Sequence, residues 1–179
     1  AVIDECGECD GDNSSCTGCT DSDALNYDSN ATISCDGCCE YSEGAHFTVD
    51  IDSTGESQLI IFQDSIQGLG IGDEIGVFDL EGVVETVDPG QSPEYGEVLV
   101  GGGIWDDSQL EISAIMSIDL SQFGGPVLNG AVDGNSLVIR VWDSSAGQEL
   151  STSPGYSAGT GTFGDLFIAV SDLGLENSV

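Results

Sequence analysis

Basic side chains are almost absent from this sequence. Against 33 aspartates and glutamates, the chain carries one arginine (Arg140), one histidine and no lysine, and its net charge at pH 7 is -32. Nucleic acids and anionic membrane surfaces both need lysine and arginine to neutralise their phosphates, so both partners are excluded. The same shortage removes the usual nucleophile and base pairings of enzymes. The sequence therefore predicts a protein that is not an enzyme.

Long apolar runs are absent as well. No stretch approaches the ~20 apolar residues that a membrane-spanning helix needs, so no membrane insertion is expected. The chain also lacks a basic segment followed by a short apolar one, the pattern of a signal peptide. We therefore expect any signal peptide to have been removed.

The excess of negative charge must be offset by something other than the protein. Hydrophobic residues make up 39% of the chain, which favours a folded protein over a disordered one. Two carboxylates ~6 Å apart repel by roughly 3 kcal/mol at an effective dielectric constant of ~20, and several such pairs rival the stability of a whole domain. Without lysine, salt bridges cannot offset this repulsion. Bound cations can, and calcium is the cation best suited to clustered carboxylates; the alternative is a salt-adapted surface without a specific site.

Cysteine is absent after residue 39, and this divides the chain into two regions. We expect a disulfide-stapled module over residues 1–44 and a self-sufficient domain over residues 45–179, with the boundary near "YSEGAH" (residues 41–46). The number of cysteines is odd, so one is free, bonded to another chain, or has lost its partner by cleavage. The seven cysteines are Cys6, Cys9, Cys16, Cys19, Cys35, Cys38 and Cys39.

The second region reads as a series of short strands separated by Gly, Asp, Ser and Pro turns. The first, "HFTVDID" (residues 46–52), alternates cleanly, with Phe47, Val49 and Ile51 on one face. This pattern predicts an all-β fold, an antiparallel β-sandwich of immunoglobulin-like or jelly-roll type. Helix should be limited to a turn or two, around residues 21–27 or 119–123. The other expected strands cover residues 58–62, 74–80, 82–87, 96–102, 110–117, 136–142, 148–153 and 164–173.

Acidic and amide residues in the first region have a spacing that suits a metal ion. "CDG" occurs at residues 9–11 and 35–37, and D-x-D or D-x-N spacing lets alternate side chains of a tight loop converge on one ion. The pattern is not a complete EF-hand loop, because the closing glutamate is missing. The predicted calcium ligands are Asp10, Asp12, Asn13, Asp21, Asp23, Asp28, Asn30 and Asp36.

Zinc is the alternative explanation for the first four cysteines. Cys6 and Cys9, and then Cys16 and Cys19, form two C-x2-C pairs, but only six residues separate them, against about 12–20 in a zinc ribbon. The surrounding carboxylates also favour a harder cation. Disulfides are therefore the preferred interpretation.

Three residues in the second region, Asp73, Asp143 and Trp105, are candidate binding residues. Asp73 and Asp143 lie at strand ends, where they could share a calcium ion at one pole of the sandwich or simply cap turns. Trp105 follows three glycines, where its ring could stack on a sugar or belong to the core. Arg140 is expected to pair with a carboxylate or to lie against Trp142.

Two glycosylation sequons lie in the first region. Asn13 begins "NSS" and Asn30 begins "NAT", and this triplet is the acceptor sequence for N-linked glycans. Both asparagines are therefore candidate glycosylation sites of a glycoprotein.

The first region resembles modules of secreted surface proteins. "DECGECDGDNSSCTGC" (residues 4–19) resembles the DECGxCxGDxSSC repeats of large surface proteins, which are similar to thrombospondin type 3 calcium repeats. "GCTDSDALNYDSNATISCDGCCEY" (residues 18–41) resembles the GCTDxxAxNYxxxATxxxGSCxY module of secreted marine bacterial proteins. The resemblance implies an extracellular, disulfide-bonded module in which Cys19 pairs with Cys39. Cys35 and Cys38 depart from the pattern; we expect them to pair with each other, and Cys16 with Cys6 or Cys9.

The second region resembles a β-sandwich domain of secreted Bacteroidetes-type proteins. The similar segments are "GDEIGVFD" (72–79), "GGGIW" (101–105) and "SLVIRVWDSSAGQEL" (136–150), and the resemblance implies fold and location only. Together these features predict an extracellular or cell-surface structural or adhesive module, a calcium-stabilised subunit that assembles with copies of itself in a filament, sheath or adhesin. The alternative is a carbohydrate-binding module that anchors a larger secreted protein to polysaccharide.

Overall fold

The computed structural model describes residues 17–20, 29–34 and 45–177. The chain divides into two compact units, Ala1–Ala45 and His46–Val179. This division lies one residue from the boundary at residues 44 and 45 that the cysteine distribution predicts.

The first unit contains a small two-stranded sheet. Strand β1 (Thr17–Gly18) pairs in parallel with β2 (Ile33–Ser34), so that Thr17 lies opposite Ile33. Cys19 follows β1; it is buried and disulfide-bonded. The other six cysteines lie outside the described residues, so the predicted disulfide pairing stays a prediction.

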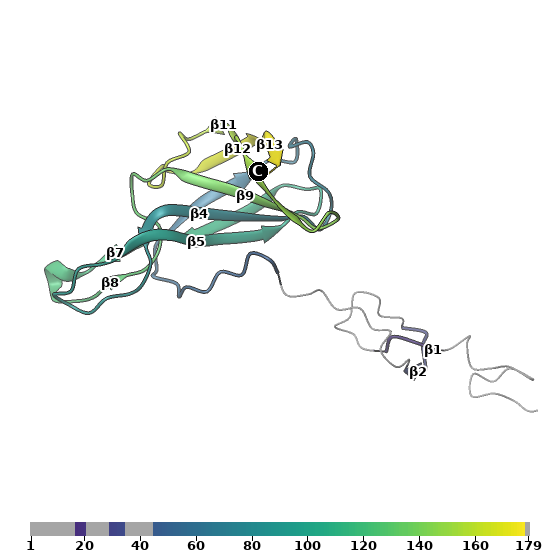
Figure 1. Cartoon of the computed structure of the whole chain (residues 1–179), viewed down its shortest axis with the longest axis horizontal. Helices are drawn as coiled ribbons and strands as arrows, with labels where there is room; N and C mark the ends of the chain where they lie inside the picture. The colour runs from purple at the N-terminus through teal and green to yellow at the C-terminus, as the bar shows by residue number, and fades with distance from the viewer. Residues whose placement is uncertain (1–16, 21–28, 35–44, 178–179) are drawn as a thin grey trace, which may run out of the picture. The chain divides into compact units, whose positions relative to one another are not determined.

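The second unit is a β-sandwich of two sheets, as predicted (Figure 1). The larger sheet has the strand order β13-β10-β9-β4-β5, and all its pairs are antiparallel. Its longest strands, β4 and β5, lie side by side and continue beyond the others (Figure 1). The strands of this sheet are β4 (Glu74–Val83), β5 (Tyr95–Ile104), β9 (Leu137–Asp143), β10 (Gln148–Thr152) and β13 (Leu175–Asn177).

The smaller sheet has the order β11-β12-β3-β6 and departs from the predicted antiparallel arrangement at one pair. Strands β12 and β3 run parallel, with Ile168 opposite Ile60. These strands are far apart in the sequence, and the chain builds most of the sandwich between them, so no hairpin constrains their relative direction. The strands of this sheet are β3 (Ser57–Phe62), β6 (Leu110–Ile115), β11 (Gly155–Ala158) and β12 (Ile168–Asp172).

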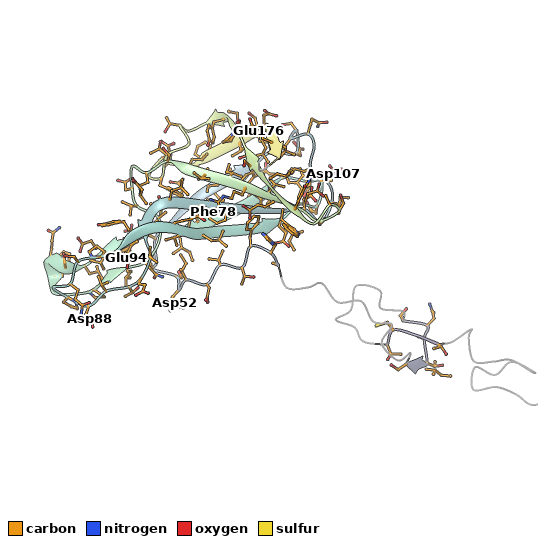
Figure 2. All side chains as sticks on the ribbon, in the orientation of Figure 1. Asp52, Phe78, Asp88, Glu94, Asp107 and Glu176 are labelled. Carbon is orange, nitrogen blue, oxygen red and sulfur yellow. The ribbon has the colours of Figure 1, made fainter. Side chains whose placement is uncertain are left out.

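A short projection extends from the sandwich (Figure 1). It consists of β7 (Ile118–Asp119), the 3-10 helix η2 (Ser121–Phe123) and β8 (Val127–Leu128), with β7 and β8 paired antiparallel. The loop that carries Asp88 belongs to the same projection (Figure 2), because Val87 forms a bridge with Val127. The helical turn lies within residues 119–123, where one was expected.

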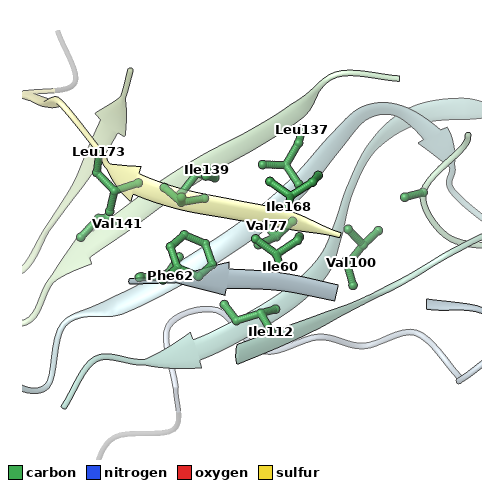
Figure 3. Close-up of a cluster of buried hydrophobic side chains, with 14 of the residues drawn as sticks. Ile60, Phe62, Val77, Val100, Ile112, Leu137, Ile139, Val141, Ile168 and Leu173 are labelled. Atoms are coloured by element: carbon green, nitrogen blue, oxygen red, sulfur yellow. The ribbon is translucent and has the colours of Figure 1, made fainter. Parts of the chain in front are cut away.

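The core lies between the two sheets and follows from the alternation of side chains along each strand. In β9, Leu137, Ile139 and Val141 are buried, whereas the residues between them face away from the core. Figure 3 shows these side chains packing against Ile60 and Phe62 of the opposite sheet. Branched apolar residues at alternate positions are favoured in strands because they fill the space between packed sheets.

The segment 46–52 belongs to no strand of either sheet, contrary to the prediction. Its side chains nevertheless alternate as predicted. Phe47 is buried and Val49 and Ile51 are half-buried, whereas the residues between them are exposed. The Phe47 ring packs on Gly76 of β4, where a Cβ atom would come within 2.8 Å of the ring, and the Phe47 carbonyl lies over Gly102 of β5. The segment therefore lies across the outer face of the larger sheet, where side-chain packing rather than strand pairing produces the alternation.

Other differences from the predicted strands involve short or irregular elements. Residues 82 and 83 belong to β4 instead of starting a new strand, and the register of β4 against β5 shifts between Asp79 and Gly82. The strands β7, β8, β11 and β13 were not predicted, because two to four residues are too few to show an alternating pattern. Among the residues that the structure describes, no helix is long and apolar enough to cross a membrane.

The contact between Gly76 and Phe47 predicts the effect of one substitution. Gly76→Ala should lower the free energy of unfolding by about 1–3 kcal/mol, because the added methyl group overpacks a site already filled by an aromatic ring. Urea denaturation measures this difference. Gly155→Ala is the matched control, since its Cβ would meet Asp172 at an ordinary 3.4 Å, and it should cost less than about 0.5 kcal/mol.

The double variant Phe47→Ala with Gly76→Ala separates this contact from other effects. With the Phe47 ring removed, the cost of Gly76→Ala should fall, because residues in contact show non-additive effects; part of the cost should remain, because the Phe78 ring also lies 2.8 Å from the added Cβ atom. An unchanged cost in the Phe47→Ala background would contradict the docking of Phe47 on β4.

Candidate functional site

Asp73 joins two loops at one end of the sandwich. It is buried, and its Oδ2 accepts a hydrogen bond from the Gly70 amide at 2.7 Å. Its Oδ1 accepts from both the amide (3.0 Å) and the hydroxyl (3.1 Å) of Ser144, in the turn that follows β9. The Asp73 carboxylate therefore holds the turn before β4 against the turn after β9.

Asp143 and Asp106 each cap a turn of their own. Asp143 Oδ1 accepts from the Ser145 hydroxyl at 2.7 Å and from the amides of Ser145 and Ala146 at 3.0 and 2.9 Å. Hydrogen bonds from Ser145, and then from Ala146, hold the pKa of Asp143 below its ordinary value. Ser108 lowers the pKa of Asp106 in the same way, through its hydroxyl first and its amide second. These contacts are typical of turn-capping aspartates.

The strand-end carboxylates thus support the turn-capping interpretation of Asp73 and Asp143. Their oxygens accept protein hydrogen bonds, and residues 17–20, 29–34 and 45–177 contain no group of three or more His, Cys, Asp or Glu side chains that could hold a metal ion. Among the predicted ligands of the first unit, the described one is Asn30, which is exposed. The other predicted ligands of the first unit lie outside the described residues; they are Asp10, Asp12, Asn13, Asp21, Asp23, Asp28 and Asp36. Asn13 is also one of the two sequon asparagines.

Trp105 belongs to the core and is not an exposed platform. Trp105 is 1% exposed. Its backbone amide donates a hydrogen bond to the Asp73 carbonyl at 2.7 Å, and its carbonyl accepts one from the Gly72 amide at 2.8 Å. The glycines before it do not expose the ring, because the loop that contains Asp73 covers this end of the sandwich. The core interpretation of Trp105 is correct, and its ring is not available to stack on a sugar.

Arg140 lies on the outer face of the larger sheet in a bidentate ion pair. Its Nη1 and Nη2 contact the two carboxylate oxygens of Glu97 at 2.9 and 2.6 Å, and its Nε lies 3.7 Å from Glu149. The guanidinium carbon lies 4.4 Å from the centre of the Phe78 ring. The expected carboxylate partner is therefore present, and the aromatic neighbour is Phe78 rather than Trp142.

His46 lies on the same face and stacks on Trp142. The two rings are 3.9 Å apart and inclined by 8°, and His46 Nε2 lies 3.3 Å from a Glu149 oxygen. Phe47 meets the His46 ring edge-on at 4.8 Å and the Phe78 ring at 5.6 Å. We call this group the outer-face clamp; its members are His46, Phe47, Phe78, Arg140 and Trp142.

The outer-face clamp brings together both basic side chains of the sequence. The register of β4 against β9 explains its position, because Gly76 lies opposite Arg140 and Glu74 lies opposite Trp142. The amide of Phe47 donates to the Glu74 carboxylate at 3.0 Å. The clamp therefore fixes segment 46–52 to the sheet and leaves Arg140 and His46 already engaged with carboxylates.

The ion pair shifts the pKa of both partners. The hydrogen bonds from Arg140 lower the pKa of Glu97, although partial burial opposes them. The same bonds raise the pKa of Arg140. An ion pair was one of the two contacts that the sequence predicted for Arg140. The sequence contains no pattern that predicts the stack of His46 on Trp142, because these residues are far apart in the chain and meet only in the folded sheet.

Asp79 is the most deeply buried carboxylate among the described residues, at 1% exposure. It accepts hydrogen bonds from the amides of Glu81 (2.9 Å) and Val132 (2.8 Å) and from the side-chain amide of Asn135 (3.0 and 2.9 Å). In the structure it lies inside the long strand β4 and organises the loop before β9.

Comparisons of the chain with protein-family models, curated proteins and solved structures found no match. The resemblances to secreted surface modules therefore stay predictions.

The ion pair of Glu97 predicts a pH-dependent contribution to stability. Because the pKa of Glu97 in the folded protein lies below its ordinary 4.5, its stabilising charge is present above that value and is lost as the pH falls through the lowered pKa. At pH 7 the variant Glu97→Gln should be less stable than the wild type by about 0.5–1 kcal/mol, as for an exposed, well-aligned pair. This difference should shrink as the pH falls below 4.5, because Glu97 becomes protonated below its lowered pKa.

Chemical denaturation at pH 7 and pH 3 measures the effect. Glu85→Gln is the control, because Glu85 is exposed and the two basic side chains of the sequence lie in the clamp. It should not destabilise the protein at either pH. A Glu97→Gln difference that is the same at both pH values would rule out the ion pair as its cause.

Proposed function

We propose that the chain is a non-enzymatic extracellular structural or adhesive module, a calcium-stabilised subunit of a surface filament, sheath or adhesin. The observation that carries this proposal is the outer-face clamp. It occupies both basic side chains, Arg140 and His46, with the acids Glu97 and Glu149. The sequence contains 33 acidic side chains and no other basic side chain. The other acids therefore have no basic side chain with which to pair.

Cations are the remaining source of positive charge for such a surface. Screening by salt weakens repulsion between exposed carboxylates, and the sandwich can rely on this diffuse effect. Specific calcium binding is proposed for the first unit, where aspartates with D-x-D spacing are concentrated between residues 10 and 36. Divalent ions there would also bridge acidic neighbours that otherwise repel one another.

Two further observations support an extracellular, non-catalytic role. The disulfide bond of Cys19 is typical of proteins that fold in an oxidising compartment. The histidine, the usual general base at neutral pH, is stacked on Trp142 and paired with Glu149. These contacts give the His46 ring a packing role at the start of the sandwich.

Assembly with copies of the same chain is the proposed purpose of the module. Strand β6 is an edge of the smaller sheet and pairs with β3 alone among the described strands. Its side chains alternate between exposed ones, Glu111 and Ser113, and buried ones, and at its end the Ile115 carbonyl accepts a hydrogen bond from the Ala131 amide. An edge of this kind accepts a further strand through backbone hydrogen bonds, and calcium would reduce the repulsion between the two acidic chains.

The calcium proposal predicts a specific stabilisation. In 10 mM calcium the full chain should gain about 1.4–2.7 kcal/mol of unfolding free energy over chelator, if its dissociation constant lies between 10⁻⁴ and 10⁻³ M as in extracellular modules. Sodium chloride of matched ionic strength should give a smaller gain. Thermal and urea unfolding of the whole chain, with the disulfides intact, measure both effects.

Variants test where the calcium ion binds. Asp10→Asn combined with Asp12→Asn should remove most of the calcium-specific gain, whereas Asp88→Asn in the projection (Figure 2) should leave it unchanged. An equal response to sodium and calcium would contradict a specific site. Sedimentation at rising protein concentration tests assembly, and a monomer in 10 mM calcium at every concentration would contradict the filament role.

A further inference from the structure

A groove lies where β4 ends and β5 begins, next to the projection. Its central part is an open depression of about 540 Å³, a size within the usual range for a ligand site. It continues on one side along Ser136 and Val138 and on the other along Pro93, Ser117 and Ser121. We call it the Tyr95 groove; its centre is lined by Leu80, Glu81, Tyr95, Val132 and Asn135.

An irregularity of β4 creates the wall of this groove. The register of β4 against β5 shifts between Asp79 and Gly82, so Leu80 and Glu81 are not matched to residues of β5. Such bulges redirect side chains and are frequent next to binding sites. Here the bulge directs an apolar side chain into solvent, and Leu80 is 46% exposed.

The buried carboxylate of Asp79 holds the groove in shape. Each group that donates to it belongs to a groove-lining residue: the amides of Glu81 and Val132 and the side chain of Asn135. Burying an ionised carboxylate is costly unless it is fully hydrogen-bonded. A buried group that fixes three lining residues at once is the arrangement expected beneath a preorganised binding surface.

The Asn135 amide is oriented by the same contacts. Its nitrogen donates to Asp79 and also to the Glu81 carbonyl at 3.1 Å. Both amide hydrogens are therefore used inside the protein, and the carbonyl oxygen of the side chain is the group left to accept a hydrogen bond from a ligand. Asn135 lines the same depression as Tyr95, which is 60% exposed.

The lining indicates the chemistry of the ligand. Tyr95, Leu80 and Val132 offer apolar surface of the kind that packs against the C–H face of a sugar ring. Hydroxyl groups of serines and the Asn135 oxygen offer hydrogen bonds along the groove. The carboxylates of Glu81 and Asp133 accept hydrogen bonds from hydroxyl groups and repel anions. An uncharged, hydroxyl-rich chain satisfies all three features.

We propose that the Tyr95 groove binds a neutral polysaccharide, with the Tyr95 ring as its stacking surface and Asn135 as its fixed hydrogen-bond acceptor. The proposal goes beyond the structural role given above and does not depend on it. The groove lies wholly within the sandwich, so its binding can succeed or fail whether or not the chain assembles in calcium.

Affinity electrophoresis of the full chain tests the groove. The probes are soluble neutral polysaccharides (β-glucan, α-glucan, galactomannan and xylan) and two anionic ones, alginate and pectate, all in 150 mM sodium chloride. We expect retardation by at least one neutral polysaccharide and by neither anionic one. Tyr95→Ala should weaken this binding at least tenfold, and Tyr95→Phe, which keeps the ring, should retain at least a third of it.

Phe167→Ala is the matched control, because it removes another exposed aromatic ring, one that lies outside the groove. Its binding should equal that of the wild type, and circular dichroism should show that every variant keeps the β-sheet spectrum. Binding to none of the neutral polysaccharides, or to the anionic ones alone, would overturn the proposal. Equal binding by the wild type and Tyr95→Ala would overturn it as well.

Discussion

Electrostatic repulsion is the constraint on which the rest of this structure depends. With a net charge of -32 and one arginine, the protein cannot offset its carboxylates by internal ion pairs. It uses its two basic side chains together, at the outer-face clamp, where Arg140 holds Glu97 and His46 joins Glu149. The buried carboxylates of Asp73 and Asp79 are instead stabilised by hydrogen bonds from amides and hydroxyls. We propose that the rest of the acidic surface depends on the surrounding cations.

Some carboxylates are stabilised by groups of the protein itself, and we propose that the others are screened by cations. This difference relates the fold to its proposed roles. The clamp is placed where segment 46–52 meets the larger sheet, so the scarce positive charge strengthens the start of the second unit. Hydrogen-bonded aspartates hold the loops and the β4 bulge without any base. A surface left uniformly acidic suits a protein that works outside the cell in the presence of calcium, and it restricts a groove such as that of Tyr95 to ligands without negative charge.

Sequence alone could predict the sandwich, because apolar alternation in segments such as residues 137–143 is a local property that survives folding. It could not show that residues 46–52 lack a strand partner, since the same alternation arises when Phe47 packs on Gly76. It predicted an ion pair as one of two alternatives for Arg140, the other being contact with Trp142, and the structure contains the ion pair. The Asp79 network and the Tyr95 groove were beyond its reach, because Val132 and Asn135 approach β4 only through the sheet topology.

The dependence on external cations is tested most directly by measuring unfolding against salt after all divalent ions have been removed. In the full chain, the free energy of unfolding should rise steadily between 10 and 500 mM sodium chloride, because screening shortens the range of carboxylate repulsion from about 30 Å to a few ångströms. The melting temperature should rise with it by about 10 °C or more, at roughly 2–4 °C for each kcal/mol. A protein that melts at the same temperature at both salt concentrations would contradict the account.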